Sequence, residues 1–220
     1  MYKNNFFKKI HNKKEISSIG FGMYKGEESS LGDTLWFDSL LYGFKNKINV
    51  VDTAQKYRNG RSEKILGKAL KYFLNKNKLK KREDFIIISK TGLLPDYFFK
   101  KKIFNKIKLK KNNCLFDMNF CIDPNYIKWS VDNSLKNIKT NYIDFYLLHN
   151  PENAFFLPGG FKKIIKALET LEKIKKTGKI KFYGIASWNG FRRDSKAKLY
   201  LDLEKIIVAL RNKIGINNGF

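Results

Sequence analysis

The sequence contains little cysteine and histidine and no long hydrophobic run. Its two cysteines, Cys114 and Cys121, lie seven residues apart with no histidine partner at metal-ligand spacing, so no zinc or other metal site is expected. A disulfide would fit this spacing, but nothing in the sequence indicates an oxidising compartment. No run reaches the ~18 apolar residues of a membrane span, and no apolar signal-peptide core follows Met1. We therefore expect a cytoplasmic protein with no membrane partner.

Acidic residues and arginine are also scarce. The chain has 20 Asp and Glu against 45 Lys and Arg, a net charge of +25, and only six of the basic residues are arginine. Arginine is the residue that forks onto phosphates and base edges, so a lysine excess accompanied by Asn, Ile and Phe is more typical of A/T-rich codon usage. We expect no specific nucleic-acid partner, only an attraction to polyanions that fades with salt.

Five hydrophobic runs alternate with amphipathic segments, which is the pattern of successive strand–helix units in a single domain over residues 1–220. The expected strands are 16–22, 48–53, 85–89, 143–149 and 180–187. The expected helices are 34–44, 62–75, 124–138, 161–176 and 201–211.

The connection 91–123 is too long for an ordinary strand–helix loop and is rich in lysine and aromatic residues. Long connections of this kind are usually lids or disordered insertions. Three interpretations remain open: a lid that attracts an acidic substrate, a single-strand nucleic-acid patch, or a mobile insertion.

Three of the expected strands end at polar, titratable residues. In chain order these are Asp52 and Tyr57, then Lys90, then His149. The carboxyl ends of the strands are where catalytic groups collect in a (β/α)₈ barrel. Taken singly, each residue has an ordinary structural explanation, since Lys90 is one of 39 lysines and a lone histidine is usually structural. The order and the shared strand-end position together indicate an active site.

These four side chains suit proton delivery to a carbonyl oxygen. A tyrosine hydroxyl titrates near ~10, so we expect Lys90 to favour the Tyr57 phenolate and Asp52 to hold Lys90 charged. His149 adds a second donor that polarises the carbonyl. None of the four is a hydride source, so a reductase built this way needs a cofactor.

The chain resembles the aldo-keto reductases from about residue 16 to its last residue. The segments that carry the resemblance are Ile19-Gly-Phe-Gly-Met-Tyr24, Val51-Asp-Thr-Ala-Gln-Lys-Tyr57, Asn59-Gly-Arg-Ser-Glu-Lys-Ile-Leu-Gly67, Ile88-Ser-Lys-Thr91, Ile143-Asp-Phe-Tyr-Leu-Leu-His149 and Gly178-Lys-Ile-Lys-Phe-Tyr-Gly-Ile185. The second and third together are the most specific. The subgroup with Leu148-His-Asn-Pro-Glu152 and Ala186-Ser-Trp-Asn-Gly-Phe-Arg192 is the most similar.

The resemblance implies reduction of an aldehyde or ketone by NADPH, with NADH not excluded. It implies that Tyr57 is the general acid, that Lys90 and Asp52 tune it, and that His149 orients the substrate carbonyl. Further implied cofactor contacts are Gly22, Met23, Asp52 and Ser187, and implied substrate contacts are Tyr24, Tyr57 and His149. Two positions depart from the family: Ala186 and Ser187 stand where a Ser-Asn pair is common, and Met23 stands where threonine is frequent.

The fold class implied is the (β/α)₈ TIM barrel, of which this chain has about the first five units. A full barrel takes about 250 residues, and this chain has 220. We expect an incomplete barrel that lacks the last three units, with strands one and five as open edges and a tendency to self-associate or to require a missing C-terminal fragment. Activity of the 220-residue chain alone is therefore uncertain. The alternatives are a catalytically impaired nucleotide-binding or regulatory relative and a gene fragment without independent activity.

Overall fold

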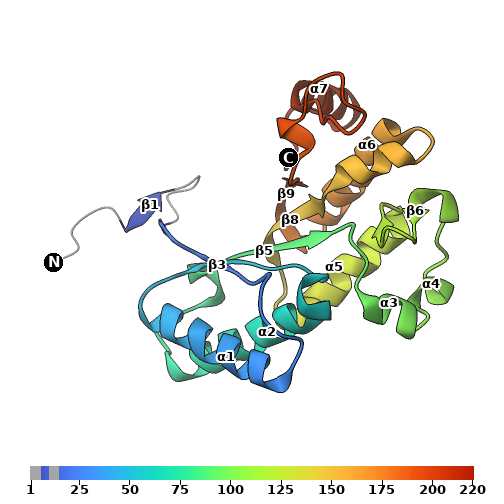
Figure 1. Ribbon diagram of the computed structural model, residues 1–220. Helices are drawn as coiled ribbons and strands as arrows, with labels where there is room; N and C mark the ends of the chain where they lie inside the picture. The colour runs from blue at the N-terminus through green and yellow to red at the C-terminus, as the bar shows by residue number, and fades with distance from the viewer. Residues whose placement is uncertain (1–5, 10–14) are drawn as a thin grey trace.

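The computed structural model describes residues 6–9 and 15–220. Their central feature is a five-stranded parallel sheet whose strands follow one another in chain order (Figure 1). The strands are β3 (Phe21–Gly22), β4 (Val50–Asp52), β5 (Ile86–Thr91), β8 (Ile143–His149) and β9 (Ile180–Ala186). Parallel neighbours in chain order with helical crossovers are the arrangement of a (β/α)₈ fold, here a partial barrel.

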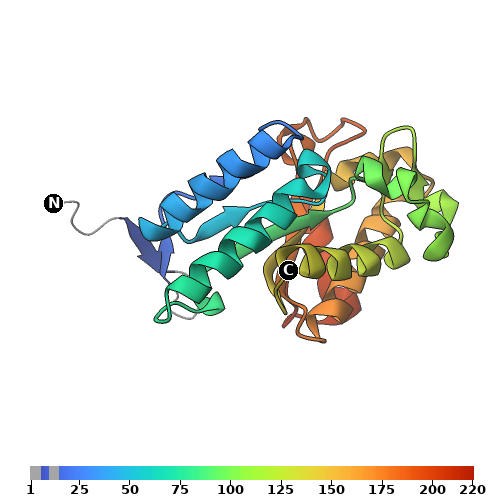
Figure 2. The same cartoon turned by 90° about the horizontal axis from the view of Figure 1, so that it is seen from below.

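One long helix follows each strand of the sheet. These helices are α1 (Ser30–Lys45), α2 (Arg61–Lys76), α5 (Pro124–Ile138), α6 (Gly160–Lys175) and α7 (Leu203–Ile214). Each packs against the next in chain order, so the helices form an outer layer that follows the curve of the sheet (Figure 2). Sequence signals set their starts, because Asp123 caps α5 ahead of Pro124 and Asp202 caps α7.

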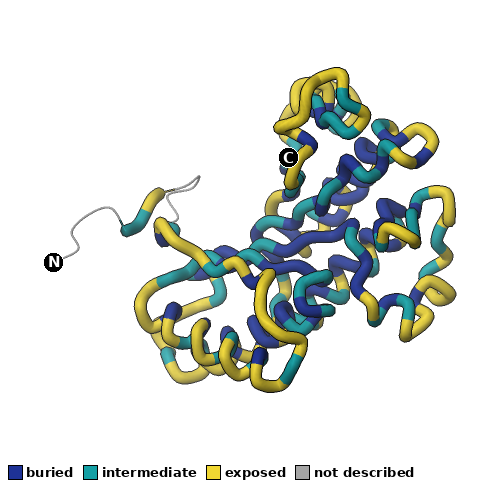
Figure 3. The backbone as a smooth tube through the Cα atoms, in the orientation of Figure 1, coloured by how far each residue is buried: buried dark blue, intermediate teal, exposed yellow. Residues whose placement is uncertain are grey.

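The main core lies between the sheet and this helical layer (Figure 3). The β5 run Ile86-Ile-Ile-Ser-Lys-Thr91 is buried along most of its length, as expected for a parallel strand covered on both faces. Helix α2 supplies apolar residues at helical spacing, all of them buried: Ile65, Leu66, Ala69, Leu70 and Phe73. The lysines of α6 lie mostly on its outer side.

The first expected strand differs from the structure. Residues 16–22 do not form one strand: β2 (Glu15–Ser17) pairs with β1 (Phe7–Lys9) in an antiparallel hairpin, and β3 follows separately. The Ser17 hydroxyl donates to the carbonyl of Ile19 at 2.6 Å, which turns the chain between β2 and β3.

The connection 91–123 is folded. It contains α3 (Asp96–Lys100), α4 (Ile103–Lys106) and the short hairpin β6 (Cys114–Leu115) with β7 (Phe120–Cys121). The remaining short elements are the 3₁₀ turns η2 (Tyr57–Gly60), η3 (Arg82–Asp84), η4 (Lys111–Asn113), η5 (Pro151–Phe156) and η6 (Gly190–Arg192).

Within residues 6–9 and 15–220, no helix is long and apolar enough to cross a membrane. The same residues contain no group of three or more His, Cys, Asp or Glu side chains placed to hold a metal ion.

Candidate active site

The register of the sheet brings the strand-end residues to one face. Asp52 is paired with Ile88, and Lys90 lies two residues further along β5. Lys90 in turn is paired with Leu147, and His149 lies two residues further along β8. Because residues two apart in a strand point to the same face, Asp52, Lys90 and His149 share one face of the sheet at its carboxyl edge.

Tyr57 reaches this edge from the turn η2, which has an unusual backbone. Arg58 and Asn59 both adopt left-handed conformations, with φ of 46° and 54°. The Arg58 side chain is buried and holds the turn: its Nε donates to the carbonyl of Glu27 at 2.8 Å, and its Nη2 pairs with Asp33 at 2.7 Å. The side chain of Asn59 accepts a hydrogen bond from the backbone N–H of Tyr97. The turn that positions Tyr57 is thus fixed from two sides.

Contacts link the four expected residues in series. Lys90 Nζ forms an ion pair with Asp52 and donates to the carbonyl of Thr53 at 3.0 Å. The same nitrogen lies over the Tyr57 ring, 4.7 Å from its centroid. The rings of Tyr57 and His149 meet edge to face with centroids 5.7 Å apart. The structure therefore brings Asp52, Tyr57, Lys90 and His149 into one cluster.

The electrostatics of Tyr57 differ from the sequence-based expectation. Burial raises the pKa of Tyr57 above its ordinary value, and the charge of Asp52 and the neighbouring Tyr24 raise it further. The expectation that Lys90 would stabilise the phenolate is wrong for this structure. The reason is geometric: the Lys90 ammonium is directed to Asp52 and Thr53 and meets the face of the phenol ring. The phenol of Tyr57 is consequently protonated at neutral pH.

Burial also governs Lys90 and His149. Desolvation lowers the pKa of Lys90, while the Asp52 carboxylate opposes that change. For His149, burial and then the positive charge of Lys90 lower the pKa to about 3. His149 is therefore neutral near pH 7, so one ring nitrogen carries a proton that it can donate and the other does not.

The residues expected around the cofactor occupy the same edge of the sheet. Gly22 ends β3 beside Asp52, and a Cβ built on Gly22 would meet nothing within 4 Å. The backbone N–H of Met23 donates to the carbonyl of Asp52 at 2.9 Å, and the Met23 side chain is buried. Ser187 follows the end of β9, so it lies at this edge as well.

The Tyr24 side chain borders the cluster from the solvent side. It is half exposed, and its ring lies 5.2 Å from the ring of Tyr57. On its other side Tyr24 meets the exposed Trp188, with centroids 6.5 Å apart. Trp188 was not expected in the site, although its position directly after Ser187 could have indicated it. The rings of Tyr57, Tyr24 and Trp188 thus form a row of edge-to-face contacts at this edge of the cluster.

Two buried carboxyls near the site also escaped the sequence reasoning. Glu152 accepts a hydrogen bond from the Ser187 hydroxyl at 2.8 Å, while its second oxygen is buried without a partner. Glu63 is fully buried and accepts from the hydroxyl of Ser89, the neighbour of Lys90, at 2.7 Å. Burial raises the pKa of Glu63. Both residues lie within the motifs quoted above, but their burial depends on contacts that are distant in sequence.

A family model described as "Aldo/keto reductase family" matches residues 18–214. Among curated proteins, the chain is 29% identical over 183 residues to an aldo-keto reductase of Bacillus subtilis, covering 80% of this chain and 44% of that protein. It is 32% identical over 180 residues to an NADH-specific methylglyoxal reductase of Escherichia coli, covering 78% of this chain and 48% of that protein. The chain thus spans about half the length of the curated relatives it matches.

A solved structure gives the same picture of the fold. The chain is similar to an aldo-keto reductase of Bacillus halodurans in its holo form, with a TM-score of 0.58 and 25% sequence identity. The match covers 84% of this chain and 51% of the other.

Proposed function

Because this chain belongs to the aldo/keto reductase family, we propose that it reduces an aldehyde or ketone to the alcohol with a nicotinamide cofactor. The single observation that carries this proposal is the contact cluster of Asp52, Tyr57, Lys90 and His149 at one strand edge. Tyr57 is the proton donor, and the other three side chains position it and the substrate.

Proton donation requires that Tyr57 hold its proton until charge develops on the substrate oxygen. The phenol meets this requirement, because its pKa lies above neutral pH. The proton then passes to the oxygen as negative charge builds there, where general acid catalysis contributes about 10²–10⁴-fold. Lys90, held by Asp52, lies over the Tyr57 ring and fixes the position of the phenol beside the substrate oxygen.

His149 supports the reaction as a neutral donor. Its lowered pKa means that the ring hydrogen-bonds to the carbonyl without giving up a full proton. In this account His149 fixes the direction of the carbonyl, and Tyr57 alone transfers a proton. Tyr24 and Trp188 cover the substrate from the solvent side.

The residues present fit the nicotinamide end of a cofactor. Open space at Gly22 leaves room for a flat ring against the end of β3. The hydroxyl of Ser187 would hold the carboxamide, although it already donates to Glu152 and accepts from the N–H of Gly190 at 2.7 Å. When bound, the reduced nicotinamide supplies the hydride for the carbonyl carbon.

The cofactor and the substrate class follow by analogy with named relatives. One is an NADH-specific methylglyoxal reductase, and another, of Meyerozyma guilliermondii, is an NADPH-dependent D-xylose reductase. We propose NADPH with NADH as an alternative, a small carbonyl substrate and a cytoplasmic location. Self-association is part of the proposal, because β3 and β9 are the outer strands of the described sheet. The β3 edge is the more open of the two, since the N–H of Tyr183 in β9 donates to the carbonyl of Gly219 at 3.0 Å.

The test is cofactor-dependent reduction of a panel of small aldehydes and ketones by the chain, followed through the loss of reduced-nicotinamide absorbance. Tyr57→Phe should lower kcat by at least ~100-fold and leave cofactor affinity nearly unchanged, because the acid acts in the transition state. Tyr42→Phe, at an exposed position of α1, is the matched control and should retain full activity. Equal rates for the chain and Tyr57→Phe would contradict the assigned role.

A second candidate is a nucleotide-binding or regulatory role without turnover. The observation that favours it is the Ser187 hydroxyl, which is already engaged by Glu152 and Gly190. Cofactor at about 100 times its Kd adds ~2.7 kcal/mol of stability. A clear rise in melting temperature with NADPH, in a chain that reduces no member of the panel, would support this second candidate over the first.

A further inference from the structure

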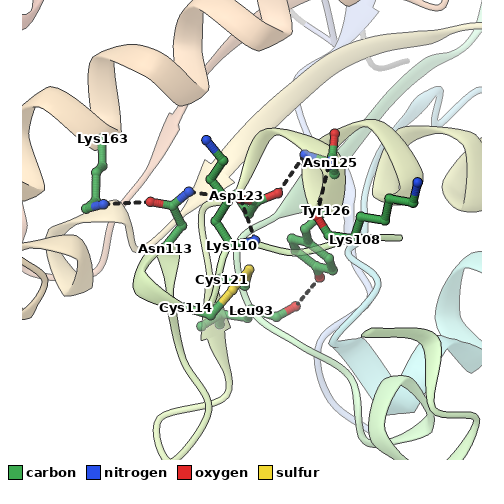
Figure 4. Close-up of a disulfide and its surroundings, with 10 residues drawn as sticks. All are labelled: Leu93, Lys108, Lys110, Asn113, Cys114, Cys121, Asp123, Asn125, Tyr126 and Lys163. Atoms are coloured by element: carbon green, nitrogen blue, oxygen red, sulfur yellow. Dashed lines mark hydrogen bonds between the residues drawn. A yellow bond between two sulfur atoms is a disulfide. The ribbon is translucent and has the colours of Figure 1, made fainter. Parts of the chain in front are cut away.

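The insertion 91–123 joins two cysteines outside the catalytic cluster. Cys114 and Cys121 lie directly opposite each other in the β6–β7 hairpin and form a disulfide (Figure 4). Both sulfurs belong to a small second core, separate from the main core, that also contains Leu94, Phe98, Ile103 and Tyr126. The ring closed by the disulfide is short, since only six residues lie between the two cysteines.

The hairpin is bound to the strand end that carries Lys90. The backbone N–H of Cys121 donates to the carbonyl of Gly92 at 2.8 Å, and that of Leu94 donates to the carbonyl of Asn119 at 2.6 Å. Gly92 itself packs on the backbone of His149, because a Cβ built on Gly92 would lie 3.0 Å from the His149 carbonyl oxygen. The disulfide hairpin is thus connected through Gly92 to the strand end that carries Lys90 and to the backbone of His149.

The first helix of the insertion contacts the turn that carries Tyr57. Lys56 pairs with Asp96 at 2.9 Å, and the backbone N–H of Tyr97 donates to Asn59 at 3.2 Å. The Tyr97 ring packs directly on Gly60, since a Cβ built on Gly60 would lie only 2.8 Å from a carbon of that ring. The insertion therefore links the Tyr57 turn to the ends of β5 and β8.

The insertion has too small a core to hold this arrangement alone. Its second core has six buried residues, and two of them are the cysteines. Small units with so little apolar burial usually need a cross-link to stay ordered. The disulfide is therefore a main support of the insertion, and its loss would loosen the contacts of Gly92, Leu94 and Tyr97.

We propose that Cys114 and Cys121 form a thiol–disulfide exchange site for a small dithiol, and that their redox state sets how firmly the insertion is ordered against the catalytic cluster. Both cysteines are buried, but Cys114 is 7% exposed and Cys121 0%, so the proposal places the attack at the sulfur of Cys114. A thiolate of the dithiol bonds to that sulfur, the Cys114–Cys121 bond breaks, and Cys121 leaves as a thiolate and takes a proton.

The second thiol of the dithiol completes the exchange. It attacks the mixed disulfide, releases Cys114 as a thiol and leaves the reductant as a cyclic disulfide. Two electrons and two protons pass from the dithiol to the protein.

The exchange is reversible in the folded protein. Backbone bonds outside the disulfide keep the two strands of the hairpin in place, among them the N–H of Ile122 to the carbonyl of Asn113 at 2.9 Å. Asn113 is itself fixed, since its amide group donates to Asp123 and accepts from Lys163 (Figure 4). After reduction the two thiols remain opposite each other, so an oxidised dithiol can close the bond again.

The test has two arms, both on the full chain. In the first, the protein is equilibrated with mixtures of reduced and oxidised dithiothreitol, quenched, alkylated and weighed by mass spectrometry. The expected result is a reversible conversion between disulfide and dithiol while the far-ultraviolet circular dichroism stays constant. A pair that remains oxidised until the protein unfolds, or that never oxidises, would overturn the proposal.

The second arm is amide hydrogen exchange of both redox states. Reduction should speed exchange at Leu94, Tyr97 and Cys121 by about 10-fold or more and leave Ile87 unchanged. The double variant Cys114→Ala, Cys121→Ala should exchange like the reduced protein and ignore the dithiol. Equal exchange at the insertion in both states would refute the ordering role, and the wild-type comparison decides this even if the variant fails to fold.

An effect of the disulfide on carbonyl reduction rests on the proposed function. The thiol–disulfide exchange and its effect on the order of the insertion do not rest on it. If the function holds, kcat/KM should differ between the oxidised and reduced proteins. An absence of turnover in both states would contradict the proposed function and leave the results of the two arms intact.

Discussion

The ion pair between Lys90 and Asp52 permits a quantitative prediction that needs no substrate. The Lys90 side chain is only 5% exposed, whereas that of Asp52 is 39% exposed. Breaking a fully buried pair by removing one partner costs about 3–5 kcal/mol, because a buried charge loses its compensation. Water screens the exposed side of Asp52, and the Thr53 carbonyl still accepts from Lys90, so Asp52→Asn should cost roughly 2 kcal/mol.

The assay is thermal and urea unfolding of three variants at neutral pH. For a chain of this length, 2 kcal/mol corresponds to a fall in Tm of roughly 4–8 °C. Lys90→Met removes the buried charge, so the double variant with Asp52→Asn should be more stable than Asp52→Asn alone. Asp132→Asn breaks the exposed pair with Lys179 at 2.6 Å and is the matched control, with a loss of at most about 0.5 kcal/mol.

The stability of Asp52→Asn should also change with pH, in a direction set by the pKa of Lys90. Burial already lowers the pKa of Lys90, and Asp52 opposes this, so Asp52→Asn lowers the pKa further. Between that lowered pKa and the ordinary lysine pKa of 10.5, the unfolded chain binds more protons, and the stability of the variant rises with pH. The reasoning is refuted if Asp52→Asn loses no more stability than Asp132→Asn, or if Lys90→Met in the same chain adds a further loss.

Two other predictions concern buried titratable groups. The pKa of His149 falls from 6.5 to about 3 on folding, so the unfolded chain binds the extra proton between these values, and stability declines as the pH falls through this window. At about pH 4.5 the loss of stability from this residue is about 3 kcal/mol. In urea unfolding, His149→Gln should lack that part of the acid sensitivity. A variant with the same pH profile of stability as the unmodified chain would contradict the prediction. The second prediction is that Glu63→Leu costs about 2–4 kcal/mol of stability, because Ser89 and Asn137 lose their acceptor. Glu63→Gln keeps one acceptor oxygen and should cost less than half as much. Equal unfolding midpoints for the two variants would count against the buried network.

Much of the site could be predicted because it depends on strand ends. The hydrophobic runs that lead to Asp52, Lys90 and His149 indicate parallel strands, and parallel strands end at a common edge. The helix 124–138 was predicted with the bounds of α5, since Asp123 and Pro124 form a strong start signal. The first turn of α1 was missed, although Ser29 caps it through the N–H of Gly32.

The features that could not be predicted depend on contacts between distant residues. Besides the disulfide, packing of Phe98 on Tyr126 helps to order the insertion. The centroids of these two rings lie 5.4 Å apart, and no local periodicity indicates that contact. The pKa of Tyr57 depends on burial and on where the Lys90 ammonium is directed, and residue types reveal neither. The pairing of Glu152 with Ser187 joins two separate loops.

The central claim is that Asp52, Tyr57, Lys90 and His149 form one carbonyl-reducing site, and isotope transfer tests it most directly. The chain is incubated with NADPH deuterated at the transferring position of the nicotinamide and with a small aldehyde, and the alcohol is analysed by mass spectrometry. The account predicts deuterium on the carbinol carbon, formed at least ~100-fold more slowly by Tyr57→Phe. Alcohol without deuterium, no alcohol at all, or an unchanged rate in Tyr57→Phe would contradict it.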